Sequence, residues 1–185
     1  MLVCNLPEEQ AKERIAKVRF WATQAREKAR HYEHKEIGYN YRMSNIVAGI
    51  GRGQMEVLSD RVEARRKMHD FYVGVFSDIE GVDVFSEPTE DYYSNHWLSA
   101  IVIDESITGK NREGLRLAFL KDNIESRPLW KPMHLQPVFA DALYYGTNVA
   151  EKLFDYGLCL PSGSNLSDDD RTRIEKVIRH FFQKV

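Results

Sequence analysis

Cysteine is scarce in this sequence of 185 residues, which has only Cys4 and Cys159, far apart along the chain. No Cys-x-x-Cys pair occurs, so the sequence does not support a zinc site built on cysteines. This usage is typical of a reduced, cytosolic protein. His31 and His34 lie three residues apart. No cysteine or carboxylate partner stands at ligand spacing, which favours two solvated loop histidines over a metal site.

Long apolar runs and an excess of one charge are also missing. No apolar stretch approaches the length that spans a membrane. The formal net charge is −2, and the basic stretch at residues 61–67 is diluted by Asp60 and Glu63. We therefore expect neither a nucleic-acid partner nor a membrane-surface role. Hydrophobic residues make up 43% of the chain, which is enough for the core of one domain.

Apolar spacing predicts helices and strands that alternate over a small sheet, which is an α/β sandwich. The expected helices lie at about residues 7–28, 44–76, 111–122, 149–156 and 167–182, the last one capped by Ser167. The expected strands lie at residues 1–4, 82–85, 97–103, 124–127 and 157–160.

The long helix that begins at Ser44 has two unusual features. It contains three glycines, which cost about 1 kcal/mol each inside a helix and therefore suggest close approach of another backbone or of a partner chain. Its arginines are expected to face outward. The glycines are Gly49, Gly51 and Gly53, and the arginines are Arg61, Arg65 and Arg66.

The stretch Glu36–Asn45 combines a glycine turn, two tyrosines, Asn40 and Arg42 in front of a helix that Ser44 would cap. The unpaired N–H groups of a first helical turn, with Asn40 and Arg42 beside them, would suit a phosphate or a carboxylate. The alternative is an ordinary turn followed by a capped helix, with Arg42 paired to a nearby acid. Spacing alone favours the turn.

A second polar stretch, Arg127–Phe139, contains three prolines that stiffen it. Arg127 and Lys131 are cations four residues apart, His134 adds a polar group, and Trp130 offers a flat stacking face. This set suits a nucleotide diphosphate-sugar. The alternative is a proline-rich surface loop whose cations are solvated.

Three stretches together resemble one family. Gly38–Ser44, Ser126–Phe139 and Cys159–Asn165 are similar to motifs of the DegT/DnrJ/EryC1/StrS sugar aminotransferases, in the family's order and at plausible spacing. These are pyridoxal-phosphate enzymes with the aspartate aminotransferase-like fold, and the resemblance covers only the second half of their usual length. It implies an α/β fold, the C-terminal small domain of that fold, with a long helix and a small sheet covered by helices.

The resemblance also implies a domain organisation. Residues 1–35 would be a remnant of the large domain's strand and helix. Residues 36–77 would form the motif loop and the long connecting helix, and residues 78–185 the small α/β domain.

Particular residues receive roles from the same resemblance. Asn40 would bind the phosphate of pyridoxal phosphate in the neighbouring subunit's site, and Arg42 would help to hold the loop or the phosphate. Arg127, Lys131 and His134 would lie beside the nucleotide-sugar substrate. The loop is most similar to that of enzymes that aminate UDP-4-keto-6-deoxy-hexoses, as in the bacillosamine pathway, and glutamate would be the amino donor.

In this family the lysine that forms the Schiff base, and the carboxylate that keeps the pyridine nitrogen protonated, lie in the large domain. None of the eleven lysines of this chain stands in the Ser-Phe-x-x-Asn-Lys type of context. The resemblance therefore implies no catalytic residue here, and we expect the chain to be inactive by itself. It would be a truncated gene product, one chain of a split enzyme with a separate large-domain chain, or an excised domain.

The alternative is a non-catalytic module of that fold, which binds nucleotide-sugars or forms a dimer through the glycine-lined helix. Without the large domain, the first helix and the glycine-rich helix face would expose apolar surface. We therefore expect the chain to self-associate as a dimer or a larger assembly.

Overall fold

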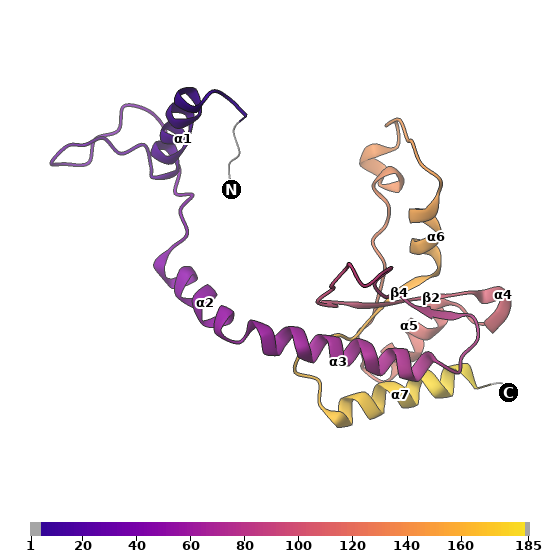
Figure 1. The fold of residues 1–185 in the computed structure, drawn as a ribbon. Coiled ribbons are helices and arrows are strands. Elements are labelled where there is room, and N and C mark those ends of the chain that lie inside the picture. The colour runs from indigo at the N-terminus through magenta and orange to yellow at the C-terminus, as the bar shows by residue number, and fades with distance from the viewer. Residues whose placement is uncertain (1–4, 184–185) are drawn as a thin grey trace. The chain divides into compact units, whose positions relative to one another are not determined.

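The computed structural model describes residues 5–183, so the strand expected at residues 1–4 lies outside the described part. The chain divides into two compact units between Glu56 and Val57. No helix among residues 5–183 is long and apolar enough to cross a membrane. Figure 1 shows the elements in chain order, from α1 near the N-terminus to α7 near the C-terminus.

The first unit contains α1 (Glu8–Ala22) and α2 (Asn45–Glu56). The first helix is shorter than predicted because the chain turns back directly after it. Gln24 and Ala25 have φ angles of 69° and 50°, in the left-handed region that ends a helix. The hydroxyl of Thr23 donates to the carbonyl of Arg19 at 2.8 Å and satisfies one acceptor of the last turn.

Ser44 caps α2, as predicted, because the backbone N–H of Val47 donates to its hydroxyl oxygen at 3.2 Å. The long helix expected from this point is interrupted. Val57 has φ −113° and ψ 9°, outside the helical region, and α3 (Leu58–Phe76) begins after it. No residue of α2 is buried in the described chain.

The second unit is built on a four-stranded antiparallel sheet in the order β1-β2-β4-β3. The strands are β1 (Val82–Val84), β2 (Ser99–Ile103), β3 (Arg127–Pro128) and β4 (Gly157–Leu160). The helices after α3 are α4 (Glu105–Thr108), α5 (Arg112–Lys121), α6 (Val149–Tyr156) and α7 (Asp168–Phe182). Two 3₁₀ turns, η1 (Met133–Leu135) and η2 (Pro137–Phe139), follow β3.

Most of these elements agree with the sequence prediction, but β3 is shorter and begins later. The reason lies at the end of α5. The N–H of Ile124 donates to the carbonyl of Phe119 at 2.9 Å, and Asn123 has a φ of 56°, so residues 122–124 close the helix instead of starting a strand.

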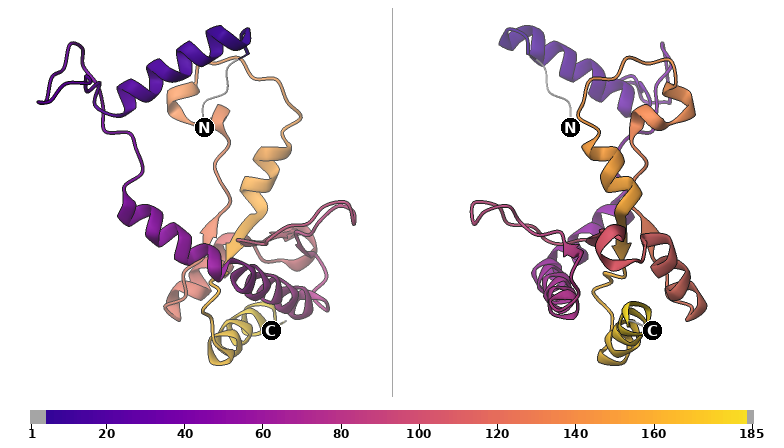
Figure 2. Two further views of the ribbon diagram at one scale, coloured as in Figure 1. Left: turned by 60° about the vertical axis from the view of Figure 1, so that its left-hand side comes forward. Right: turned by 90° about the vertical axis from the view of Figure 1, so that its right-hand side faces the viewer.

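The core lies between the sheet and α3, α5 and α7 (Figure 1 and Figure 2). In the register of β2 and β4, Ile101 faces Leu158, and both are fully buried. Tyr72 of α3 is also fully buried, and its hydroxyl donates to the carbonyl of Pro161 at 2.8 Å. Burial of apolar side chains from all these elements in one cluster is what fixes the helices on the sheet.

The loop at residues 85–98, between β1 and β2, is held on α3 by a polar network. His69 and His96 are buried and stack with their ring centroids 3.7 Å apart. His96 contacts the carboxylate of Glu87 at 3.1 Å, and Arg66 pairs with the same carboxylate at 2.8 Å. The Arg66 guanidinium lowers the pKa of Glu87 to about 2.

Burial, and then the neighbouring His69, lower the pKa of His96 below the ordinary histidine value. His96 also has a φ of 43°, a left-handed conformation that histidine adopts more readily than most residues. The network therefore keeps a charged carboxylate and a neutral imidazole side by side under the loop.

Candidate functional site

The segment at residues 38–41 is fixed on the end of α1 by backbone hydrogen bonds. The N–H of Tyr39 donates to the carbonyl of Trp21 at 2.7 Å, and the N–H of Tyr41 donates to the carbonyl of Ala22 at 3.1 Å. A side chain on Gly38 would place its Cβ 2.2 Å from backbone atoms of Gln24 and Ala25. Glycine is therefore required where the two backbones meet.

Asn40 and Arg42 are exposed on this segment. Neither side chain makes a hydrogen bond or an ion pair with another residue in the range 5–183, so their donors are available to a ligand. The rings of Tyr39 and Tyr41 stack on each other with centroids 5.1 Å apart. Asn40 borders a shallow pocket of about 640 Å³, which is also lined by Tyr32, His34 and Gly38.

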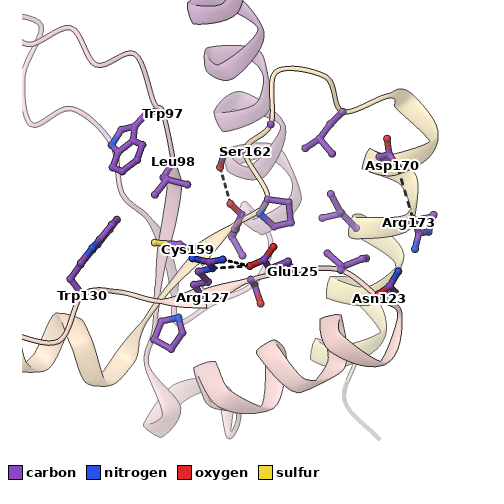
Figure 3. A pocket seen from close by; sticks show the side chains of 18 residues that line it. Trp97, Leu98, Asn123, Glu125, Arg127, Trp130, Cys159, Ser162, Asp170 and Arg173 are labelled. Atoms are coloured by element: carbon purple, nitrogen blue, oxygen red, sulfur yellow. Dashed lines mark hydrogen bonds and ion pairs between the residues drawn. The ribbon is translucent and has the colours of Figure 1, made fainter. Parts of the chain in front are cut away.

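A second pocket, of about 670 Å³, lies at the end of the sheet in the unit of residues 57–185 (Figure 3). Trp97, before β2, and Trp130, after β3, form one side with their ring centroids 5.9 Å apart. Both residues are more than half exposed, at 59% and 67%. Cys159 of β4 also lines the pocket, and burial raises the pKa of its thiol. The pocket thus offers a ligand two exposed aromatic faces, which are tilted by 33° relative to each other.

Arg127 lines this pocket and forms an exposed ion pair with Glu125, with 78% and 73% of the two side chains accessible. Its guanidinium donates to the carboxylate of Glu125, with the Nε–Oε1 distance at 2.8 Å, and Figure 3 shows the pair inside the pocket. Arg173 and Asp170 stand on the α7 side with their charged atoms 3.9 Å apart. A ligand that needs the Arg127 cation would have to compete with Glu125.

Lys131 and His134 do not line the pocket with Arg127. After Trp130 the chain leaves the sheet and enters η1, so Lys131 is exposed. The ring of His134 contacts the carboxylate of Glu151 at 2.9 Å and stacks on Tyr144, with centroids 3.8 Å apart. Of the three predicted substrate residues, only Arg127 lines this pocket, while Lys131 directly follows the pocket residue Trp130 and His134 is held by Glu151 and Tyr144.

Long-range hydrogen bonds hold the Trp97 and Ser162 segments of the pocket in place. Arg65 was expected to face outward, which is wrong: it donates to the carbonyls of Trp97 and Ser162, the latter at 3.2 Å. The buried hydroxyl of Ser162 accepts from the N–H of Ser99 at 2.8 Å and donates to the carbonyl of Leu160 at 2.8 Å. Arg66 was expected outward as well, yet it pairs with Glu87.

Comparison with known proteins decides the family. The sequence profile of the DegT/DnrJ/EryC1/StrS aminotransferase family matches residues 1–179. The chain belongs to this family. Pyridoxal phosphate is the cofactor of the DegT/DnrJ/EryC1/StrS aminotransferases, as the resemblance of the three motifs implied.

Two curated relatives and one solved structure illustrate the relationship. The chain is 46% identical over 175 residues to a putative pyridoxal phosphate-dependent aminotransferase, EpsN, of Bacillus subtilis (strain 168), covering 92% of this chain and 44% of that protein. It is 34% identical to the GDP-perosamine synthase of Escherichia coli O157:H7, covering 83% of this chain and 40% of that protein. The chain thus spans less than half the length of both relatives.

The solved structure is that of the aminotransferase TlmJ from Streptoalloteichus hindustanus. It superposes with a TM-score of 0.76 at 20% identity, and covers 91% of this chain and 44% of that one. The predicted fold is confirmed: the chain has the small-domain architecture of the sugar aminotransferases, with a small sheet covered by helices.

The residues present fit the phosphate end of the family cofactor. Asn40 and Arg42 carry N–H donors without a partner among residues 5–183, on a segment whose backbone is held by hydrogen bonds. An amide and a guanidinium are suitable ligands for phosphate oxygens.

Proposed function

We propose that this chain is the C-terminal part of a pyridoxal-phosphate-dependent nucleotide-sugar aminotransferase. The observation that carries the proposal is the family match over residues 1–179. The reaction would move an amino group, from glutamate as donor, to a 4-keto-6-deoxy sugar nucleotide. The bound cofactor would supply the electron sink for this transfer.

Within this proposal the two sets of site residues have different tasks. Asn40, with help from Arg42, binds the cofactor phosphate in the site of a neighbouring subunit. Arg127, Lys131 and His134 contact the nucleotide-sugar. The exposed indoles of Trp97 and Trp130, beside Arg127, support an aromatic ligand such as a nucleobase at this pocket.

We propose the domain organisation in the same terms. Residues 1–35 belong to the large domain, residues 36–77 carry the motif loop and the connecting helices, and residues 78–185 form the small domain.

We further propose that none of this chain's lysines holds the cofactor covalently, so that the chain alone is inactive. The test is to incubate the chain with pyridoxal phosphate, reduce with borohydride and map the modified lysines by mass spectrometry. We expect low, scattered labelling of exposed lysines. Stoichiometric labelling of one lysine would contradict the inactive chain.

Reconstitution tests the role of Asn40. The chain is mixed with the N-terminal half of the Bacillus subtilis relative, and amino transfer from glutamate to UDP- and GDP-4-keto-6-deoxy sugars is measured. We expect activity only with both parts present, and a loss of at least about tenfold for Asn40→Ala, since one hydrogen bond to a charged group contributes about 1.5–3 kcal/mol. Activity of Asn40→Ala equal to that of the unchanged chain would refute the role.

A second candidate function is a non-catalytic nucleotide-sugar-binding module. It is favoured by one observation: the Trp97–Trp130 pocket lies within the unit of residues 57–185 alone. Calorimetry with UDP- and GDP-sugars should then show binding by the isolated chain, weakened in Arg127→Ala and Lys131→Ala. Arg116→Ala is the matched control because Arg116 also pairs with a glutamate, Glu113, but outside the pocket. No binding at all would rule out this candidate.

A further inference from the structure

Helices α5 and α7 pack against each other in the second unit (Figure 1). A groove lies between them and shares only Arg173 with the Trp97–Trp130 pocket. It has a volume of about 990 Å³. Its floor is apolar and is formed by Leu117, Ala118, Val177 and Phe181. Leu117 is 43% exposed, so a ligand can reach the floor.

The walls of the groove are strongly positive. Four cations line it, from the loop before α5, the last turn of α5, and α7, and they are opposed by one acid, Asp122. Because Arg173 also pairs with Asp170 at 3.9 Å, the four cations exceed these two acids by two charges, in contrast to the net charge of −2 for the whole chain. The cations are Lys110, Lys121, Arg173 and Lys176.

Most of these cations lack an ionic partner in the described part of the chain. Lys12, Lys17 and Lys67 each pair with a glutamate elsewhere in the chain. Lys110, Lys121 and Lys176 make no ion pair with any residue in the range 5–183, which is also true of Lys28, Lys131 and Lys152. The ammonium of Lys110 lies 5.5 Å from the centre of the Phe181 ring. Charges that are not neutralised within the chain are available to carboxylates of a partner.

We propose that the α5–α7 groove binds an acidic amphipathic segment of a partner protein. Its apolar side chains would lie on the Leu117–Phe181 floor and its carboxylates would face the lysines on the walls. A bare phosphate compound would leave the apolar floor without a partner, and a membrane surface would not enter a groove between two helices. The ten residues of α5 make this helix about 15 Å long, so a helix bound alongside it would contact it over roughly three turns.

The lysines allow a test that leaves the Trp97–Trp130 pocket unchanged, since only Arg173 lines both cavities. The probe is a fluorescein-labelled peptide of sixteen residues with leucine on one helical face and glutamate on the others, and a matched peptide has lysine in place of glutamate. Binding to the full chain is measured by fluorescence anisotropy at two salt concentrations. We expect the acidic peptide to bind, less tightly at high salt, and the basic peptide not to bind.

The decisive variant is Lys121→Glu with Lys176→Glu, which should weaken binding at least about tenfold. Its control is Lys28→Glu with Lys152→Glu, which makes the same change in net charge at two exposed lysines outside the groove and should bind like the unchanged chain. Leu117→Ser should weaken binding several-fold at both salt concentrations, because it acts on the floor and not on the charge. Circular dichroism checks that each variant is folded.

Three results would overturn the proposal. One is equal binding of the acidic and the basic peptide. Another is equal affinity of the groove variant and the control variant. The third is tighter binding of inorganic triphosphate, or of phosphatidylserine vesicles, than of the acidic peptide, which would assign the groove to a different class of ligand.

Discussion

At the scale of single residues, Gly38 decides whether the Asn40 segment can lie against α1. The position has no room for a side chain, since a Cβ would meet backbone atoms that cannot rotate away. By contrast, a Cβ at Gly49 in α2 would have no atom within 4 Å. Glycine is therefore required at Gly38 by the lack of space for a side chain, whereas no such steric requirement exists at Gly49.

We expect Gly38→Ala to destabilise the first unit by about 1–3 kcal/mol, the usual cost of forcing extra atoms into a packed contact. Gly49→Ala should instead stabilise α2 by about 0.5–1 kcal/mol, because alanine is the better helix former. Urea unfolding followed by circular dichroism measures both. Equal effects of the two substitutions would show that the Gly38 contact is not tight in solution.

The candidate site residues show what sequence could and could not supply. The motif at residues 38–44 predicted a turn with exposed donors before a capped helix, and the Ser44 cap is confirmed. The roles of Arg65 and Ser162 could not be predicted. Their partners, Trp97 and Ser99, are 32 and 63 residues away in sequence, and no local pattern specifies such a contact.

At the scale of elements, the loop at residues 85–98 depends on α3 for its position. Arg66 and His69 of α3 supply the contacts, and Glu87, His96 and the carbonyl of Phe85 receive them. The neutral state of His96 and the ionised state of Glu87 both belong to the folded loop. Protonation of His96 or Glu87 at low pH therefore weakens the contacts that hold this loop on α3.

We expect stability to fall in two steps as the pH is lowered. The pKa of His96 is lowered by folding, so below the ordinary value of about 6.5 the unfolded chain binds the extra proton and gains stability relative to the folded one. Ionised Glu87 contributes to the free energy of unfolding at pH values above its ordinary pKa. This contribution is lost as the pH falls toward its folded pKa of about 2.

His96→Asn should remove the step near pH 6.5, since asparagine tolerates the left-handed backbone and does not titrate. His180→Asn, at an exposed histidine of α7, is the control and should keep the step. Thermal unfolding between pH 4 and 8 measures both variants. A step near pH 6.5 that persists in His96→Asn would assign it to another group.

The elements with regular patterns were the predictable ones. The amphipathic spacing and the Ser167 cap correctly predicted where α7 begins and ends. The observed α6 and β4 also agree with the predicted ranges. The break at Val57 was not predictable, because valine continues the apolar spacing and only its backbone angles end the helix. The early end of α1 depends on the 39–41 segment that returns beside it, which is a tertiary effect.

At the scale of the whole molecule, the exposed apolar side chains of α2 are the main feature. Ile46 is 72% exposed and Ile50 62% exposed, and α1 and α2 contain no buried residue. Full burial of such a side chain contributes about 1.5–3 kcal/mol. A second copy of the chain, or another protein chain, would gain this free energy by covering α2.

We therefore expect the isolated chain to self-associate, and Ile46→Ser with Ile50→Ser to shift it toward monomer. Sedimentation velocity over a range of concentrations measures this. Ile107→Ser, at an isoleucine of α4 that is 53% exposed, should leave the distribution unchanged. A monomer at all concentrations for the unchanged chain would contradict the expectation.

The edges of the sheet bear on what form such association takes. One edge is β3, whose two residues include Pro128, which has no N–H to offer to an added strand, and the other is the three-residue β1. Neither edge is a good template for strand addition, so copies of this chain should join through helices and not through a growing sheet. Concentrated, aged samples should accordingly stay free of fibrils that bind thioflavin T. The two short edge strands, β1 and β3, would thus protect the sheet from amyloid formation.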